Sequence, residues 1–470
     1  MTTTHEAGWA HASGALRGPS WLRAPGDPNE LVPELWSSTA RKVDGDLVVG
    51  GIAVADLVAE HNTPAYVLDE DDFRGRARAF RDAFGQDAGW DVYYAGKAFL
   101  CTTVARWVAE EGLSLDVCSA GELTVALRAG FDPARIGYHG NNKSLRDLRR
   151  AVDAGVGRII VDSFTEIERL AAATRDLGRT AGVMVRVTAG VEAHTHEYIA
   201  TAHEDQKFGF SISSGDALEA VRRVHAAEGL ELLGLHSHIG SQIFDSSGFE
   251  VAARRVLALH ARVAEELGVT MPEMDLGGGF GIAYTTQDDP SEPAQLAVEM
   301  GRIVDHECRA LGIGRPRLSV EPGRAIVGPS MCTVYTVGTV KPVTLDGGAV
   351  RTYVSVDGGM SDNIRTALYD ADYSCTLAAR ASEAPPVLAR VVGSHCEAGD
   401  IVVKDEFLPG DVAPGDLVAV PGTGAYCRSM ASNYNHALRP PVIAVRDGVA
   451  SVVLRRETED DLLATDVGAE

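Results

Sequence analysis

The sequence predicts an α/β protein in which a (β/α)8 TIM-like barrel is combined with a separate antiparallel β-sandwich or β-barrel domain. Between about residues 90 and 322, short apolar runs alternate with amphipathic stretches whose apolar residues recur at helical spacing. After residue 330 the runs become alternating, rich in β-branched residues and separated by Gly and Pro turns. At 470 residues the chain exceeds one ordinary domain, so two domains are expected.

Eight apolar runs are candidate strands, and each is followed by a candidate helix. The runs are DVYYA (91–95), LSLDV (113–117), RIGYH (135–139), RIIVD (158–162), VMVRV (183–187), LLGLH (232–236), EMDLG (273–277) and RLSVE (317–321). Eight such pairs are the number that a (β/α)8 barrel needs. On periodicity alone, a doubly wound open sheet is the alternative.

Polar residues at the ends of these runs favour the barrel. Each lies at or just past the C-terminal end of its run: Lys97, Asp116, His139, Arg186, His238, the glycines 277–279 and Glu321. Barrel enzymes place their chemistry at that face. We therefore expect these residues to share one site.

The last third of the chain has a different residue pattern, typical of β strands. Its runs are TVYTVGTVKPV (333–343), TYVSVDGG (352–359), PVLARVVGS (386–394), DLVAVPG (416–422) and PPVIAVRDGVASVVLRR (440–456). KVDGDLVVGGIAV (42–54) has the same character, with a DG turn between apolar runs. We therefore expect a leader and N-terminal β strands in residues 1–66, the barrel in 67–328 and the rest of the β domain in 329–470.

Composition excludes several classes of protein. The net charge is −23 and no Lys/Arg-rich block stands out, so nucleic-acid binding is not expected. No run of about 18 apolar residues predicts a membrane span, and the N-terminus does not resemble a secretory signal. The seven cysteines are scattered and contain no C-x-x-C pair. A zinc site or disulfide framework is not expected, and a cytoplasmic location fits.

Two motifs suggest covalent chemistry beside an anion site. YYAGKAF places Lys97 just after a strand, where a desolvated amine could form a Schiff base with an aldehyde. In DLGGGFGI (275–282), consecutive glycines after the seventh strand would let backbone N–H groups approach a phosphate. The alternatives are an ordinary surface lysine and a plain tight turn.

Two further motifs lie at the ends of the sixth and eighth strands. In SVEPGR (319–324), Glu321 could pair with a protonated ring nitrogen or form a structural ion pair with Arg324. In LHSHIGSQ (235–242), a histidine could stack on a planar ring and Ser241 could bind phosphate. H-x-H here and HTHE (194–197) also allow a metal, but no carboxylate completes either cluster at ligand spacing, so no metal is predicted.

Together these motifs resemble the fold-type III pyridoxal-phosphate (PLP) decarboxylases, the alanine-racemase-like barrel group that includes diaminopimelate, ornithine and arginine decarboxylases. The similarity covers residues 30 to 460 and is nearest to the diaminopimelate enzymes. Its motifs, in chain order, are YAGKAF, LDVCSAGEL, HGNNKS, AHTHEYI, KFGF, HSHIGSQ, GGGFGI, EPGR, DGGMSDNIR, CEAGD and TGAYC.

The resemblance implies roles toward PLP. Lys97 would bind the cofactor covalently, His238 would stack on its ring and Glu321 would bind its ring nitrogen. The phosphate would be held by Ser241, Gly277, Gly278, Gly279, Gly323, Arg324 and Tyr426.

The resemblance also implies a homodimer with active sites shared across the interface. Cys396 of one subunit would protonate the product carbon in the other subunit's site. The substrate contacts would come from Arg324, Arg365, Tyr369, Glu397 and Tyr426.

Charge matching supports meso-2,6-diaminopimelate as the substrate, with L-lysine and CO2 as products. The far end of diaminopimelate carries both a carboxylate, which Arg365 and Arg324 could clamp, and an ammonium group, which the acidic CEAGD segment suits. Ornithine and lysine lack the distal carboxylate.

Three departures from the family pattern bear on this specificity. They are Gly96 before the lysine, Phe280 after the glycines, and Ile364 with Thr366 where prolines are common. Losing prolines would loosen the loop that aims Arg365. The rival interpretations are a decarboxylase of another basic amino acid, a racemase, and a regulatory relative without PLP.

Overall fold

The computed structural model describes residues 18–19, 21–86, 89–190, 207–345 and 348–468. They form two compact units. The barrel unit contains residues 74–281 and 290–326. The β unit contains the described residues up to Phe73, the segment Ile282–Asp289, and the described residues from Val327 onward.

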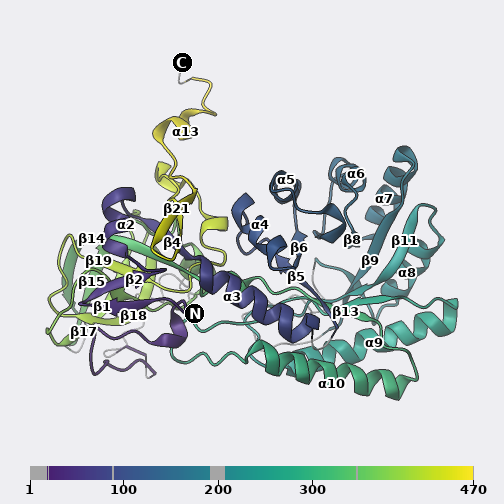
Figure 1. The fold of residues 1–470 in the computed structure, drawn as a ribbon, viewed down its shortest axis with the longest axis horizontal. Helices are drawn as coiled ribbons and strands as arrows, with labels where there is room; N and C mark the ends of the chain where they lie inside the picture. The colour runs from purple at the N-terminus through teal and green to yellow at the C-terminus, as the bar shows by residue number, and fades with distance from the viewer. Residues whose placement is uncertain (1–17, 20, 87–88, 191–206, 346–347, 469–470) are drawn as a thin grey trace, which may run out of the picture. The chain divides into compact units, whose positions relative to one another are not determined.

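In the described part of the barrel unit, eight parallel strands close into a barrel (Figure 1). They are β5 (Asp91–Ala95), β6 (Ser114–Val117), β7 (Ile136–Tyr138), β8 (Arg158–Val161), β9 (Ala181–Thr188), β11 (Leu230–His236), β12 (Glu273–Asp275) and β13 (Arg317–Val320). The last strand pairs with the first, with Ser319 opposite Asp91. This closure confirms the predicted barrel, because an open doubly wound sheet leaves its edge strands unpaired.

Helices follow the strands as predicted, and α9 and α10 run side by side (Figure 1). They are α4 (Thr102–Glu110), α5 (Ala120–Arg128), α6 (Leu145–Ala154), α7 (Phe164–Leu177), α8 (Asp216–Ala226), α9 (Ser247–Leu267), α10 (Pro293–Leu311) and α11 (Arg324–Val327). The remaining elements are α3 (Glu70–Phe80), which crosses the unit boundary, the π turn η2 (Arg81–Gln86), the 3-10 turn η3 (Pro133–Arg135) and the short strand β10 (Phe210–Ser211).

Local sequence explains where these helices begin and end. Ser144 begins α6 with a capping box in which Asp147 bonds back to the cap. Gly155 ends α6 in the left-handed region at φ 75°, which a residue without a Cβ adopts easily. The seventh strand, β12, ends at Asp275 and is therefore shorter than the predicted run 273–277.

The β unit contains a larger sheet and a small three-stranded one. The larger sheet contains β4 (Ala65–Asp69), β14 (Met331–Thr344), β15 (Val350–Val356), β16 (Thr376–Leu377), β17 (Pro386–Val392), β18 (Ile401–Pro409), β19 (Leu417–Val420), β20 (Val442–Arg446) and β21 (Val449–Leu454). The small sheet contains β1 (Arg41–Val43), β2 (Asp46–Val49) and β3 (Ile52–Ala53). The helical elements are η1 (Pro33–Leu35), α2 (Val54–His61), α12 (Arg365–Tyr369), η4 (Arg428–Met430), η5 (Tyr434–His436) and α13 (Glu459–Leu463).

The larger sheet is mixed, whereas an antiparallel domain was predicted. β15 pairs with β17 in parallel, and so does β4 with β20. Parallel neighbours need long connections. Such connections exist here, because α12 and β16 lie between β15 and β17, and the barrel sequence lies between β4 and β20.

Segments far apart in the chain build the core of the β unit. The predicted DG turn joins β1 to β2, with positive φ at both Asp44 (51°) and Gly45 (91°). Leu47 N donates to the carbonyl of Ala378 at 2.8 Å, so β2 lies beside the C-terminal third of the chain (Figure 1). Ala283, from the segment Ile282–Asp289, belongs to the same apolar core.

Within the described ranges, no helix has both the length and the apolar character that a membrane crossing requires.

The packing of the barrel strands leaves no room for a side chain at Gly234, which can be tested by substitution. A Cβ at this position in β11 would lie 1.9 Å from the carbonyl oxygen of Glu273 in β12. We predict that Gly234→Ala lowers the free energy of unfolding by about 1–3 kcal/mol, measured by urea denaturation. Gly301→Ala is the control, because Gly301 lies in α10 with no atom within 4 Å of an added Cβ, and alanine there should stabilise the helix. Equal stability of Gly234→Ala and wild type would contradict the packing described.

Candidate active site

Three loops at the C-terminal end of the barrel carry many of the residues singled out in the sequence. Gly278 N donates to Nδ1 of His238 at 3.2 Å. Glu321 N donates to the carbonyl oxygen of Gly277 at 2.9 Å. The loops after β11, β12 and β13 are therefore hydrogen-bonded to one another.

The loop after β13 also reaches β5. Ala95 N donates to the carbonyl of Pro322 at 3.1 Å, and a Cβ on Gly323 would lie 2.9 Å from Cβ of Ala95. Arg324 Nη2 donates to Oγ of Ser241 at 2.9 Å. The structure thus assembles the EPGR, HSHIGSQ and GGG motifs around the end of the strand that precedes Lys97.

The triple-glycine turn is required by close backbone packing. A Cβ on Gly278 would lie 2.2 Å from the carbonyl of Glu321, and one on Gly277 would lie 2.4 Å from that of Ser237. Gly277 N donates to Oδ1 of Asp275 at 2.6 Å, and the next N–H donates to the histidine ring described above. Two N–H groups of the turn are thus engaged within the protein, so a phosphate role for this turn stays a prediction.

Lys97 lies at the same end of the barrel, directly after β5. The turn before it is fixed by Gly96 N, which donates to the carbonyl of Asp116 at 2.9 Å. A Cβ on Gly96 would approach that oxygen to 2.8 Å, which explains the small residue there. The side chain is exposed, so the described part of the single chain does not form the desolvated pocket expected for this amine.

His238 is neutral in this environment. Burial lowers the pKa of its imidazole well below the ordinary value, and the positive charges of Lys97 and Arg186 lower it further. A neutral ring can lie against another planar ring without the cost of burying a charge. The interaction with Lys97 also places that amine close to the histidine.

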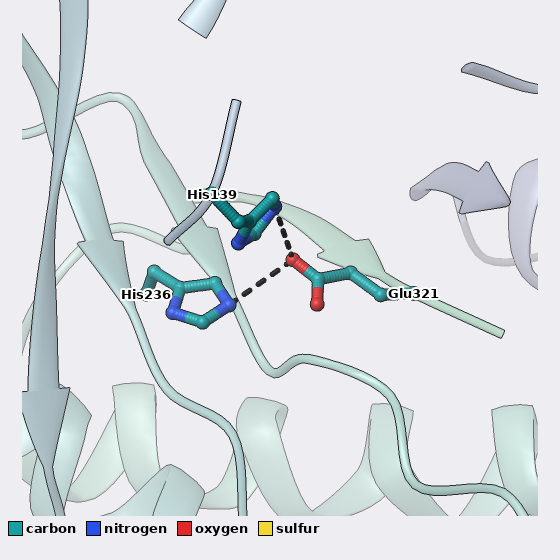
Figure 2. Close-up of side chains that lie close together, drawn as sticks. All are labelled: His139, His236 and Glu321. Atoms are coloured by element: carbon teal, nitrogen blue, oxygen red, sulfur yellow. Dashed lines mark ion pairs between the residues drawn. The ribbon is translucent and has the colours of Figure 1, made fainter. Parts of the chain in front are cut away.

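Two buried histidines meet the carboxylate of Glu321 (Figure 2). Nε2 of His236 lies 3.0 Å and Nε2 of His139 3.3 Å from Glu321 Oε1. Glu321 is 7% exposed and His236 only 1%. Neither ring aims an N–H straight at the oxygen, so these are close electrostatic contacts rather than well-aligned hydrogen bonds.

A second layer of charge lies inside the barrel. The Arg158 guanidinium pairs with Asp275 at 2.5 Å, donates to Ser319 Oγ at 2.9 Å and lies 3.5 Å from the ring centre of Tyr93. Asp116 Oδ1 is 3.9 Å from the same guanidinium. One buried cation thus serves several buried carboxylates.

Because these ionisable side chains are buried close together, their pKa values shift away from the ordinary values. Burial raises the pKa of Asp116 to about 7. Burial lowers the pKa of His139 well below its ordinary value. Burial and Asp116 act to raise the pKa of Glu321, but His139 and His236 outweigh them and hold it below its ordinary value. Glu321 is therefore a buried anion at neutral pH.

His139, His236 and Glu321 could by proximity hold a metal ion, since their ligand atoms lie within 4.8 Å of one another. The two H-x-H histidines, His236 and His238, are not the pair that meets here, because His139 comes from the loop after β7. HTHE (194–197) lies outside the described residues.

Sequence reasoning noted His139 and His236 but not their meeting, and it missed Arg158 and Asp275. An arginine opening a strand whose residues are otherwise apolar, as in RIIVD, is the signal that could have found Arg158. HGNNKS contains a structural lysine: Lys143 Nζ donates to the carbonyls of Gly140 and Ile160 at 2.7 Å each. Nζ also pairs with Glu166 at 2.7 Å. It fixes the loop that begins with His139.

In the β unit, Arg365 at the start of α12 is 5% exposed and surrounded by aromatic rings. Its guanidinium carbon lies 4.6 Å from the ring centre of Tyr284, and Nη1 donates to the hydroxyl of Tyr373 at 2.5 Å. Among the described residues no carboxylate pairs with it, and its Nε has no hydrogen-bond partner. The two tyrosines were not predicted, because their local sequence carries no signal.

The helix that carries Arg365 is anchored where family members have prolines. Ile364 occupies the N-cap position of α12, directly before Arg365. Thr366 Oγ1 donates to the carbonyl of Val402 at 3.1 Å. Tyr369, four residues after Arg365, is half-buried on the same helix face. The looser loop expected from the lost prolines is thus countered by a hydrogen bond to the sheet.

The CEAGD loop presents exposed reactive groups from a fixed backbone. Cys396 and Glu397 are exposed, and Tyr434 OH donates to Glu397. The buried Asp400 accepts from His395 N at 2.7 Å and from Met360 N at 2.6 Å. The loop backbone is therefore held in place although the side chains of Cys396 and Glu397 are exposed.

Tyr426 is held in a costly backbone conformation. Its φ is 65°, in the left-handed region that a tyrosine rarely adopts. The preceding Gly424 packs so closely that a Cβ would lie 1.7 Å from the carbonyl of Val327. Such outliers persist only where the surroundings enforce them, and they concentrate at functional sites.

Comparison with known proteins shows which family this chain matches. Residues 70–328 match the family described as pyridoxal-dependent decarboxylase, pyridoxal binding domain. The chain is 57% identical to the diaminopimelate decarboxylase of Mycobacterium tuberculosis, over 93% of this chain and 98% of that protein. It is 42% identical to that of Bacillus subtilis, over 92% and 98%.

Solved structures agree in fold. The diaminopimelate decarboxylase of M. jannaschii in complex with L-lysine matches with a TM-score of 0.84 and 29% identity, over 92% of this chain and 98% of that one. A lysine/ornithine decarboxylase from Vibrio vulnificus matches with a TM-score of 0.70 and 23% identity, which shows a common fold.

The raised pKa of Asp116 predicts a pH effect on stability. Between about pH 4 and 7 the folded protein keeps a proton that the unfolded chain has lost, so this group's contribution to stability falls as pH rises. In Asp116→Asn that loss is absent. We expect the free energy of unfolding of the variant, relative to wild type, to increase from pH 4 to 7 and then level off, measured by urea denaturation. Parallel profiles for the two proteins would contradict this.

Proposed function

The chain belongs to the pyridoxal-dependent decarboxylases, and from this premise we propose that it decarboxylates meso-2,6-diaminopimelate to L-lysine and CO2. Its cofactor is pyridoxal 5'-phosphate (PLP), and the reaction is that of a carboxy-lyase. Identity of 42–57% over nearly the whole chain supports this reaction, which is the last step of lysine biosynthesis.

The residues at the barrel end fit PLP. A primary amine, a neutral imidazole and a buried carboxylate lie at strand ends on one face, and Ser241 and Arg324 offer donors suited to a phosphate. Several buried polar atoms there lack aligned partners, including both carboxylate oxygens of Asp116 and Nδ1 of His236. Buried polar atoms without partners are costly, which favours a polar group that enters the site.

Bound PLP supplies an electron sink for the electron pair that remains when the α-carboxylate leaves as CO2. In our proposal Lys97 would hold the cofactor through its amine. Glu321 would hold a proton at the ring nitrogen, and His238 would lie against the ring. Tyr426 helps Ser241 and Arg324 to hold the phosphate.

Arg365 carries the substrate assignment. A buried guanidinium without a carboxylate partner is costly, and a substrate that brings a carboxylate to it removes that cost. The tyrosines beside it contact the positive charge but do not neutralise it. We therefore assign Arg365, with Arg324 and Tyr369, to the distal carboxylate, which ornithine and lysine lack.

Glu397 and Cys396 complete the proposed site from the second subunit of a homodimer. Both are exposed on a loop that the buried Asp400 orders, which suits residues that act outside their own chain. In this proposal Glu397 binds the distal ammonium group of the substrate. Cys396 donates the proton to the α-carbon after CO2 leaves. The seven cysteines all carry reduced thiols, which supports the cytoplasm as the location.

The test is a substrate panel of meso-diaminopimelate, ornithine, lysine and arginine, with CO2 release measured for wild type and Arg365→Gln. We expect meso-diaminopimelate to have the highest kcat/KM, and Arg365→Gln to lower that value about 100-fold or more. Arg365→Lys keeps the charge but loses the fork geometry, and should fall between the two. A higher kcat/KM for ornithine than for meso-diaminopimelate would refute the substrate assignment.

Lys97→Ala should lower turnover by about 10³-fold or more while leaving a folded dimer. Mixing this variant with Cys396→Ala should restore about a quarter of wild-type activity, because half of the dimers are mixed and each has one intact site. A mixture of Lys97→Ala with Glu321→Gln is the control and should restore nothing, since both residues belong to one barrel unit. Failure of the first mixture to exceed the control would place Cys396 outside a shared site.

A further inference from the structure

The contacts of the Glu321 carboxylate are divided unequally between its two oxygens. Both imidazoles lie near Oε1 (Figure 2). The Arg158 guanidinium is more distant, 3.9 Å from the same oxygen. Among the described residues, none of the ion pairs of Glu321 ends on Oε2. One oxygen is thus fixed by the protein and the other remains available.

Without a compensating interaction, the surroundings of Glu321 would favour the protonated, uncharged form of its carboxyl group. Asp275 in the neighbouring strand β12 and Asp116 in β6 are buried acids, and Arg158 already pairs at 2.5 Å with Asp275. Burial and a nearby like charge both favour the protonated acid. Of the basic side chains that pair with Glu321 in the described part of the chain, the two histidines are the nearest, at 3.0 and 3.3 Å, whereas Arg158 lies 3.9 Å away. They are therefore what keeps the carboxylate ionised.

The two histidines are not equivalent. Nε2 of His139 also lies 3.1 Å from Asp116 Oδ1, so it is shared between two acids. Among the described acidic residues His236 pairs with Glu321 alone, and it is the closer of the two histidines. Their rings meet edge to face with centroids 5.1 Å apart, which restricts the rotation of both.

We propose that His139 and His236 are positioning residues that keep the Glu321 carboxylate charged and fixed at Oε1, so that Oε2 is available to the ring nitrogen of bound PLP. This rests on the proposed cofactor role of Glu321 and extends it to residues with no assigned role. His236 makes the larger contribution, because its contact is shorter and is not shared.

Two pairs of substitutions test this proposal. His236→Leu removes the polar hydrogen, whereas His236→Gln can place an amide N–H near the position of Nε2; the same pair is made at His139. The PLP dissociation constant of each holoenzyme is measured by equilibrium dialysis. We expect the Leu variants to bind PLP about 10- to 100-fold more weakly, with the larger loss at His236, and the Gln variants to stay near wild type.

His260→Asn is the matched control for losing a buried histidine. His260 lies in α9 of the barrel unit, where its Nε2 contacts the carbonyl oxygen of Met271 at 2.9 Å. This variant should lose stability without losing PLP affinity. Leu variants that bind PLP as tightly as His260→Asn would overturn the proposal.

A double-mutant cycle separates positioning from general damage. If the histidines act through Glu321, His236→Leu should have little further effect on PLP affinity in a Glu321→Gln background. An undiminished effect there would overturn the proposal. So would a change in wild-type PLP affinity after treatment with a chelator, since that would make the cluster a metal site. These readouts stand apart from turnover, so a wild type that binds PLP but releases no CO2 from diaminopimelate would refute the proposed function and leave this inference testable.

Discussion

Closure of the barrel is the constraint on which the site depends. The last strand, β13, pairs with the first, β5, so the loop that contains Glu321 lies against the turn that contains Lys97. A Cβ on Gly323 would lie 2.9 Å from the Cβ of Ala95, so no larger residue fits at Gly323 without a shift. A nucleophilic amine and a buried carboxylate from opposite ends of the barrel sequence thereby share one end of one barrel.

Closure of the barrel also places several charged side chains in its buried interior. Arg158 crosses toward Asp275 and Ser319, and Asp116 and Glu321 occupy the same interior. Several acids around one guanidinium cannot all remain ionised at little cost. The structure resolves this by raising the pKa of Asp116 to about 7 and by placing two histidines beside Glu321.

The β unit follows a different physical rule, in which rigid surroundings present reactive groups. Arg365 is fixed by aromatic rings and by a short helix that Thr366 ties to the sheet. Asp400 orders the loop of Cys396 and Glu397 by accepting two backbone N–H groups. A site built on such supports loses little conformational entropy when a substrate binds.

The sequence by itself determined the barrel, the sheet-rich second unit and the motifs at the strand ends, because strand and helix periodicities and glycine turns are local properties. Even the DG hairpin at residues 44–45 follows from two residues. Only the tertiary structure decided that His139 meets His236 over Glu321, and that Tyr284 lies against Arg365. It also decided that the sheet is mixed and that Lys97 is exposed. These features depend on which distant segments lie together, and no local pattern encodes that.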